Sequence, residues 1–373
     1  MKVLVISLAG IGDTLFATPL IHELREHFPE ATLDALVLWR GSRDLLETNP
    51  HLNRVHQRNL LADSPLAALR YLLRLRREGY DLSFNTHPQS RVHYRLVAGI
   101  IGARTRISHR YDNASLLDSL LTHRALPQDY SRHAIENNLA LLELIGLKPR
   151  LPAHSYELFL TRADTEWAER FIAAHGLGNH TLLGIHVGSG GTKNLAWRRW
   201  PLEHYIELIR RLTAARPGLR VLLLGGPEEQ ADHAHILAQT DRARVFQPAT
   251  ENVRQAAALL RHCRAFLSVD TALMHVAAAM RVPGQVVIET PTWNKPIEPH
   301  GNRFILVPNR ALAGRNLQYY RYDGRGIRGT REEIARLMRS VTVEAVEAAL
   351  SAVLQEAETP RPVERGSGEQ IRP

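Results

Sequence analysis

The sequence has little cysteine and no long apolar run, and both absences narrow the class of protein. Cys263 is the only cysteine among 373 residues, so an intramolecular disulfide is impossible and a reducing compartment fits. No uninterrupted apolar run approaches the roughly 20 residues that a membrane-spanning helix needs. Met1 begins a core-type strand without the basic start and cleavage site of a signal peptide, so we expect a cytoplasmic protein.

Negative charge is also in short supply, which leaves a net charge of +9 and a pI near 10.0. Nucleic acid, anionic membrane lipid and an anionic glycolipid are the partners that such a charge favours. No helix-turn-helix, zinc finger or aromatic-basic RNA-binding signature occurs, so we expect no nucleic acid. General arginine-rich usage remains the alternative explanation, since charge concerns association and solubility and not fold.

Apolar strand candidates alternate with helical stretches in both halves of the chain. The expected strands are Lys2–Leu8, Thr32–Leu38, Leu82–Asn85, Thr105–Ser108, Leu182–His186, Arg220–Leu224, Ala265–Val269, Gln285–Ile288 and Phe304–Val307. The expected helices are Thr14–His27, Pro65–Arg77, Val92–Ile101, His133–Ile145, Leu202–Ala215, Pro227–Ala238, Asn252–Arg261 and Ala272–Met280. This alternation predicts an α/β protein of two doubly wound, Rossmann-like domains, whose ligands bind beyond the carboxyl ends of the strands.

The domain boundary is expected in the proline-bearing stretch from Leu147 to Leu160. We therefore predict one domain over residues 1–155 and a second over residues 156–330. A closing helical segment should follow over residues 331–357. Residues 358–373 lack a core pattern, which predicts a disordered tail.

The strongest local signal is a strand-to-helix junction in the second half. The expected strand Ala265–Val269 runs into Asp270 and Thr271, both good capping residues, and a small-residue helix follows at once. Unpaired backbone N–H groups at such a helix start suit a phosphate. His275 lies about one turn beyond Thr271 on the same face. The alternative is an ordinary helix cap followed by a core histidine with a satisfied hydrogen bond.

A second junction follows the first expected strand. Gly10 and Gly12 allow a tight turn there, but Leu15 stands where a dinucleotide fingerprint needs its third glycine. The remaining chemical group is the carboxylate of Asp13 at the mouth of a parallel sheet. The alternative is an aspartate that only caps the helix.

Together the two junctions resemble glycosyltransferase family 9, the heptosyltransferases of lipopolysaccharide core assembly. The matching residues, in family order, are Gly12-Asp13-Thr14 with Thr18-Pro19, Arg198-Arg199-Trp200-Pro201, Gly225-Gly226-Pro227-Glu228-Glu229 and Asp270-Thr271-Ala272-Leu273-Met274-His275. The resemblance implies the GT-B fold, with the active site in the cleft between the domains. It also implies Asp13 as the general base of an inverting transfer. The sequence contains no Asp-x-Asp pair for a divalent cation, so we expect neither metal nor cofactor.

The resemblance places the nucleotide sugar, with ADP as the expected nucleotide, on the second domain. Arg198 stands where the family usually has a phosphate-contacting lysine, and the loop 188–193 offers further phosphate contacts. Arg198 and Arg199 as a solvated basic segment, and Glu229 as an exposed first-turn acid, are the alternatives. The expected donor-binding residues are Thr192, Lys193, Arg198, Glu229, Asp270, Thr271, Ala272, Leu273, His275, Asn294 and Lys295. Ala272 and the segment 288–296 depart from the family pattern, which leaves the donor sugar open.

The acceptor is expected on the first domain. An anionic, lipid-linked inner-core saccharide would suit arginines near the strand ends, and it would bring the protein to the cytoplasmic face of the inner membrane. The expected acceptor-binding residues are Gly12, Thr14, Arg40, Arg91 and Arg95, with Arg43, Arg104, Arg106 and Arg110 as further candidates. Two other functions remain open: a GT-B transferase using a UDP- or GDP-hexose, and a non-catalytic basic protein that binds glycolipid or nucleic acid.

Overall fold

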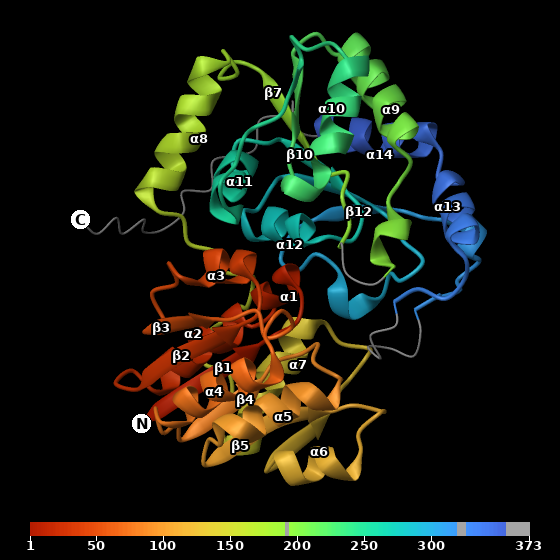
Figure 1. Ribbon diagram of the computed structural model, residues 1–373. Helices are drawn as coiled ribbons and strands as arrows, with labels where there is room; N and C mark the ends of the chain where they lie inside the picture. The colour runs from red at the N-terminus through yellow and green to blue at the C-terminus, as the bar shows by residue number, and fades with distance from the viewer. Residues whose placement is uncertain (191–193, 319–325, 356–373) are drawn as a thin grey trace.

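The structure is a computed structural model, and it describes residues 1–190, 194–318 and 326–355. Two parallel six-stranded sheets lie one above the other in Figure 1, each covered by helices on both faces. In the described residues no helix is long and apolar enough to cross a membrane. The predicted α/β architecture with two doubly wound sheets is confirmed.

The first sheet has the strand order β3-β2-β1-β4-β5-β6. Its strands are β1 (Lys2–Ser7), β2 (Thr32–Val37), β3 (Arg54–Gln57), β4 (Leu82–Asn85), β5 (Thr105–Arg110) and β6 (Arg124–Pro127). Alternate residues of β1 enter different cores, because successive side chains of a strand point to opposite faces. Val3 and Val5 pack with α2 (Thr18–His27), whereas Leu4 and Ile6 pack with α4 (Pro65–Arg76) and α5 (Val92–Ile101).

The second sheet has the order β12-β11-β10-β7-β8-β9, which repeats the first order when the strands are numbered from β7. Its strands are β7 (Thr181–Ile185), β8 (Leu219–Leu223), β9 (Val245–Phe246), β10 (Ala265–Ser268), β11 (Gly284–Ile288) and β12 (Phe304–Val307). One core holds side chains from α9 (Leu202–Ala215), α13 (Arg331–Arg339) and α14 (Val343–Gln355). The opposite core holds α8 (Arg162–Ala174), α11 (Val253–Leu260) and α12 (Ala272–Ala279), and α10 (Gln230–Gln239) lies beside α9.

Several elements differ from the sequence prediction. The edge strands β3, β6 and β9 and the helices α3 (Arg40–Leu46), α6 (Leu116–Leu121) and α8 were not expected. The predicted helix Thr14–His27 is two helices, α1 (Ile11–Leu15) and α2, which are separated at Phe16 and Ala17. The helix predicted over 133–145 is α7 (Ala134–Ala140) followed by a 3₁₀ turn, η1 (Leu141–Ile145). The closing segment is two helices, α13 and α14, and the predicted disordered tail lies outside the described residues.

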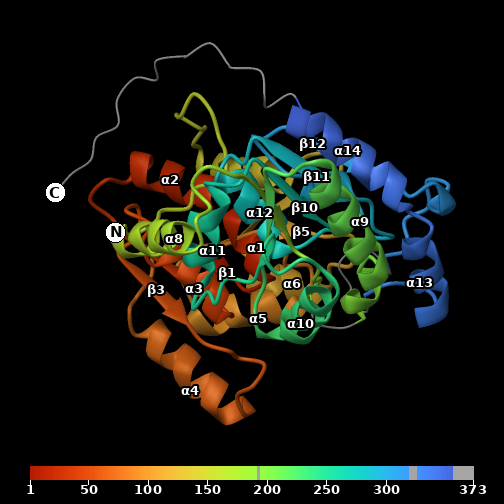
Figure 2. The same cartoon turned by 90° about the horizontal axis from the view of Figure 1, so that it is seen from above.

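The two domains contact each other through helices at the carboxyl edges of both sheets. Helix α1 packs on α12 and α3 packs on α11, which both views of the ribbon also show (Figures 1 and 2). Phe16 and Leu45 belong to the same buried cluster as α11 and α12. Arg254 of α11 donates hydrogen bonds to the Glu47 carboxylate and the Asp44 carbonyl across the boundary. The two carboxyl edges therefore face each other.

Candidate functional site

The two junctions predicted from sequence lie against each other. A Cβ atom added to Gly12 of α1 would come within 2.7 Å of His275 Cδ2 and 3.0 Å of Ala272 Cα in α12. Only a residue without a side chain allows this approach, which accounts for a glycine at position 12. The ring of Phe16 also meets His275 edge-on, with 4.9 Å between the ring centroids. The structure thus joins two motifs that are separated by more than half of the chain.

Asp13 lies inside the first turn of α1, and Gly10 is the residue before that helix. One carboxylate oxygen, Oδ2, accepts a hydrogen bond from the backbone N–H of Gly10 at 2.7 Å. Asp13 therefore does cap the helix, although from its third position. The side chain is half-buried at the carboxyl edge, so capping and a role as a base are compatible.

Arg198 ends the 3₁₀ turn η2 (Leu195–Arg198), and its side chain is buried in a cluster beside the start of α12. Its guanidinium donates to the Asp270 carboxylate at 2.6 Å, to the Asp270 carbonyl at 3.0 Å, to Ser189 Oγ at 2.7 Å and to Thr292 Oγ1 at 2.8 Å. The alternative of a solvated basic segment is wrong for Arg198. Asp270 was expected to act through the turn it caps, but its carboxylate pairs with Arg198, and the cap of α12 is Thr271.

Thr271 and His275 lie on the first two turns of α12. Thr271 Oγ1 accepts a hydrogen bond from the Met274 N–H at 3.3 Å, which leaves the first N–H groups of the helix available to an anion. His275 is buried, and its Nδ1 lies 3.1 Å from the Tyr156 hydroxyl. Burial, with the nearby positive charge of Arg198, lowers the pKa of His275 to about 3. His275 is therefore a neutral, hydrogen-bonded core histidine, as the alternative interpretation predicted.

Glu229 is buried, so the alternative of an exposed first-turn acid is wrong. Its Oε2 accepts a hydrogen bond from the Gly226 N–H at 2.9 Å, which repeats the arrangement of Asp13 and Gly10. Its Oε1 lies 3.3 Å from an Arg199 nitrogen, and Arg199 also pairs with Asp232. A Cβ at Gly188 would come within 2.3 Å of this carboxylate, so Glu229 lies directly beside the loop that follows β7.

The remaining predicted donor residues lie in three places: on α12, in the segment after β11, and in the segment after β7. Ala272 is half-buried at the first position of α12, and Leu273 packs in the core shared by the two domains. Asn294 donates to the Thr292 carbonyl, which connects it to the Arg198 cluster, and Lys295 is exposed beside it. Thr192 and Lys193 lie outside the described residues.

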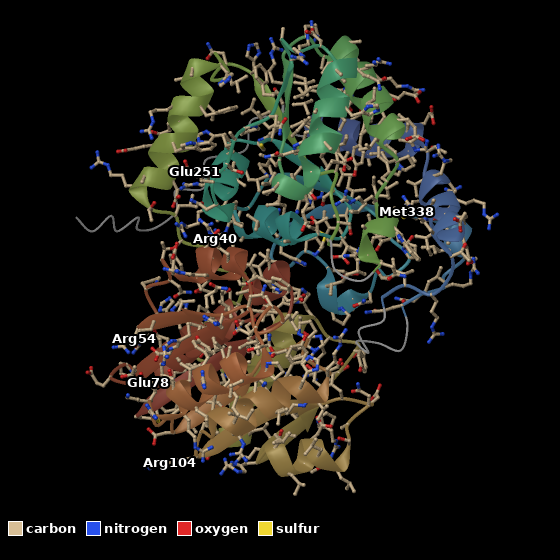
Figure 3. The ribbon with its side chains drawn as sticks, viewed as in Figure 1. Arg40, Arg54, Glu78, Arg104, Glu251 and Met338 are labelled. Atoms are coloured by element: carbon tan, nitrogen blue, oxygen red, sulfur yellow. The ribbon has the colours of Figure 1, made fainter. Side chains whose placement is uncertain are left out.

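The predicted acceptor residues fall into two groups. Gly12, Arg40 and Arg91 lie at the carboxyl edge of the first sheet, and Arg40 is exposed at the top of this domain (Figure 3). Thr14 and Arg95 are buried. The Thr14 hydroxyl donates to Ser42 Oγ at 2.8 Å. Arg95 pairs with Asp118 at 2.6 Å and donates to the carbonyls of Gln89 and Ser90, so its guanidinium holds the loop after β4 and does not face an acceptor.

The further arginines are dispersed. Arg43 pairs with Glu47 and Arg104 with Asp81, both on the surface, whereas Arg106 donates to the Leu121 carbonyl. Arg110 ends β5 and is exposed. These four side chains form no common cluster.

Tyr156 is one of the residues near the site that sequence reasoning missed. It lies in the segment between the domains, and its hydroxyl donates to the Glu298 carbonyl while it contacts His275. His133 Nε2 lies 2.9 Å from the same carbonyl. A lone tyrosine in an irregular segment carries no sequence pattern, so no signal pointed to it.

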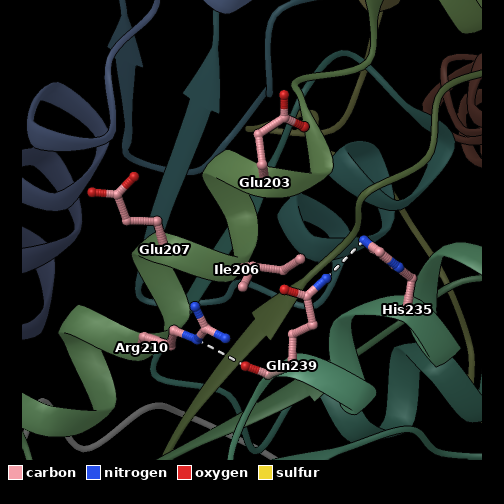
Figure 4. A pocket seen from close by; sticks show the side chains of 6 residues that line it. All are labelled: Glu203, Ile206, Glu207, Arg210, His235 and Gln239. Carbon is pink, nitrogen blue, oxygen red and sulfur yellow. Dashed lines mark hydrogen bonds between the residues drawn. The ribbon is translucent and has the colours of Figure 1, made fainter.

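One group in the described residues has metal-ligand chemistry, namely His22, His51 and Glu157. One ligand atom from each residue lies within 4.8 Å of the other two. The two imidazole rings are stacked, with centroids 3.8 Å apart and planes 18° apart. His22 Nδ1 and Glu157 Oε1 are 2.6 Å apart, which is a hydrogen-bond distance. We interpret the group as a hydrogen-bonded cluster. A pocket between α9 and α10, lined by Glu203, Arg210 and Gln239 among others, holds none of the predicted residues (Figure 4).

Comparisons with known proteins identify the relatives of this chain. A family model described as glycosyltransferase family 9 (heptosyltransferase) matches residues 68–315, a range that includes Glu229 and the whole second junction. Lipopolysaccharide heptosyltransferase 3 of Escherichia coli strain K12 is 26% identical over 285 residues, which cover 73% of this chain and 78% of that protein.

Two solved structures show the same fold. A family 9 glycosyltransferase from Veillonella parvula has a TM-score of 0.73 at 19% identity, over 95% of this chain and 97% of its own. The ADP-heptose LPS heptosyltransferase II of E. coli has a TM-score of 0.71 at 22% identity, over 96% of this chain and 100% of its own. The predicted GT-B fold is confirmed.

Proposed function

The chain belongs to glycosyltransferase family 9, and we propose that this glycosyltransferase moves heptose from ADP-heptose to a lipopolysaccharide core acceptor. In the proposed reaction, an acceptor hydroxyl attacks the anomeric carbon of the donor. Asp13 takes the proton of that hydroxyl, the bond to the diphosphate breaks, and ADP leaves. A single attack from one side inverts the anomeric configuration.

One observation carries this proposal: the contact of Gly12 with Ala272 and His275, which sets Asp13 beside the start of α12. A carboxylate at the end of one sheet and an anion-binding helix start at the end of the other are the two groups that the transfer requires. The names of the relatives support heptose as the sugar and the core saccharide as the acceptor.

On the donor side, the proposal assigns stabilisation of the leaving diphosphate to protein groups alone. Three groups in this region can stabilise the negative charge of a diphosphate. They are the Thr271 hydroxyl, the first N–H groups of α12 and the Arg198 guanidinium. Arg198 is paired with Asp270 here, so binding a diphosphate exchanges part of that pairing for phosphate contacts. Glu229 is proposed as the ribose ligand, since a carboxylate accepts hydrogen bonds from two adjacent hydroxyls.

On the acceptor side, the proposal assigns residues 1–155 to the acceptor and residues 156–330 to the nucleotide sugar. Arg40 and Arg91, at the carboxyl edge, are the proposed ligands of acidic groups on the inner core. An acceptor anchored in lipid also implies that the enzyme works in the cytoplasm, at the inner face of the inner membrane. The net charge of +9 suits that surface.

Calorimetric titration with ADP, UDP and GDP, followed by turnover with the corresponding sugars, tests the proposal. ADP should bind most tightly, and ADP-heptose should be consumed in excess EDTA. Loss of turnover that Mg²⁺ or Mn²⁺ restores would contradict the proposed leaving-group chemistry. Preference for UDP or GDP would favour a hexosyltransferase, and failure to bind any nucleotide would leave a basic scaffold that binds glycolipid or nucleic acid.

A further inference from the structure

Exposed apolar side chains gather on one side of the first domain. Among the described residues ten large hydrophobic side chains are exposed, and apart from Met1 all lie on three helices and the loop before them. They are Leu61, Leu66, Leu69, Leu73, Val92, Leu96, Leu116, Leu117 and Leu120. Helix α4 contacts α5, and α5 contacts α6, so the three helices that carry these side chains form one continuous layer (Figure 1).

The packing of the domain does not require these leucines. On α4 the core positions are Leu72 and Leu75, whereas Leu66, Leu69 and Leu73 follow a spacing of three and four along the outer side. A helix that covers a core ordinarily carries polar residues on that outer side. On α6, Leu116 is 87% exposed and Leu120 is 76% exposed, one turn apart. Exposed apolar side chains that gather on three adjoining helices in this way indicate an interaction site.

The same layer carries positive charge and almost no negative charge. Arg70, Arg74 and Arg76 are exposed on α4, and Arg77 follows directly. Asp118 is the only carboxylate within α4, α5 and α6, and it is buried against Arg95. Leucines interleaved with arginines suit a surface that offers both hydrocarbon and anionic groups, as the interface of an anionic bilayer does.

The layer also adjoins the carboxyl edge that bears Asp13. In a sheet of parallel strands every connecting helix begins at that edge, so Leu66, Val92 and Leu116 all lie in first turns near it. Tyr94, between Val92 and Leu96 in sequence, is close enough to Asp13 for that carboxylate to contribute to the raised pKa of its hydroxyl, whose main cause is burial.

We propose that the leucine–arginine face of α4, α5 and α6 docks on an anionic lipid bilayer, with its leucines inserted among the headgroups. The proposal rests on the proposed function, because docking by this face brings the carboxyl edge and Asp13 to the surface where a lipid-linked acceptor is exposed. Insertion of leucines adds a component of binding that salt does not screen.

Sedimentation with phosphatidylcholine vesicles, with and without phosphatidylglycerol, tests this face on the full chain. The wild type should bind the vesicles with phosphatidylglycerol much more tightly than those without it, and part of that binding should persist at high salt. Leu116→Ser with Leu120→Ser should remove the salt-resistant part. Arg70→Gln with Arg74→Gln should weaken binding at low salt by about fivefold per arginine. The control pair Arg242→Gln with Arg261→Gln removes two exposed charges from the second domain and should bind like the wild type.

Unchanged vesicle binding by the leucine pair, or equal losses from the control pair, would overturn the proposal. Binding of this face to an acidic protein, with no binding to the vesicles, would also overturn it. All variants alter exposed side chains, and equal melting temperatures would exclude misfolding. ADP titration of the same proteins separates the two proposals. Vesicle binding without ADP binding would refute the enzyme function alone, and ADP binding without vesicle binding would refute this face alone.

Discussion

Asp13 caps the start of α1 and is also the proposed general base, and a substitution can separate these two roles. Oδ2 accepts the Gly10 N–H, a bond that an asparagine side-chain oxygen can also accept. A base, however, needs the carboxylate. The amide therefore preserves the helix start while it removes the proposed chemistry.

Asp13→Asn should lower turnover by roughly 10²–10⁴-fold, because an amide cannot take the acceptor proton at neutral pH. ADP affinity and the melting temperature should remain close to wild type. Asp13→Ala should lose the same turnover and in addition about 1 kcal/mol of stability, because the helix start loses its capping bond. Steady-state kinetics with calorimetry measures both, and turnover of Asp13→Asn within threefold of wild type would show that Asp13 is only a cap.

Substitutions of Thr271 test whether its hydroxyl binds the diphosphate as well as capping α12. Thr271→Ala should weaken ADP binding about tenfold, since a hydrogen bond to a charged phosphate is worth roughly 1.5–3 kcal/mol. It should also cost about 1 kcal/mol of stability through the lost cap of α12. Thr271→Ser keeps the hydroxyl and is the matched control. Equal ADP affinity for the alanine and serine variants would mean that the diphosphate binds elsewhere.

At the scale of elements, the contact of α1 with α12 depends on the missing side chain of Gly12. Gly12→Ala should separate the helices, because the new Cβ meets backbone in Ala272 as well as the His275 ring. Such overpacking typically costs 1–3 kcal/mol.

We expect Gly12→Ala to lose at least tenfold in turnover, while Gly218→Ala, which meets nothing within 4 Å, should behave like the wild type. A crystal structure of the alanine variant with the α1–α12 spacing unchanged would contradict this explanation, as would full activity.

The elements that sequence predicted well are those with one strong hydrophobic signal. The apolar runs of β1, β2 and β10 identified buried parallel strands and, through them, both junctions. The edge strands β3, β6 and β9 are short and partly polar, so their patterns resemble loops. Contacts such as Arg198 with Asp270 join residues 72 positions apart and leave no local pattern. Sequence could therefore identify the junction residues, but not which of them would pair with one another.

At the scale of the whole molecule, buried histidines make stability depend on pH. Burial lowers the pKa of His109 and His233 to about 4 and of His133 and His275 to about 3, and it also lowers the pKa of His87. The unfolded chain binds protons at these groups below about pH 6.5, whereas the folded chain does not. Their contribution is therefore complete above that pH and is lost as pH falls toward the folded pKa values.

Below the unfolded pKa near 6.5 each of these groups loses about 1.4 kcal/mol per pH unit, so a fall from about pH 7.5 to 5.5 should remove several kcal/mol in total. A native protein has only 5–15 kcal/mol in total, so scanning calorimetry should show a large fall in melting temperature. His233→Gln should reduce this pH dependence, and His235→Gln, exposed on the same helix, should not. A melting temperature that is constant over this range would refute the account.

The close approach of Gly12 to Ala272 and His275 also restricts how hybrid enzymes can be made. A hybrid of this first domain with a relative's second domain keeps its two halves in register only if the incoming helix offers a small residue at position 272 and a ring no larger than imidazole at position 275. It also needs an arginine at position 254 for the Glu47 carboxylate. Domains can therefore be exchanged only between parents that match at these few positions, however similar the rest of their sequences.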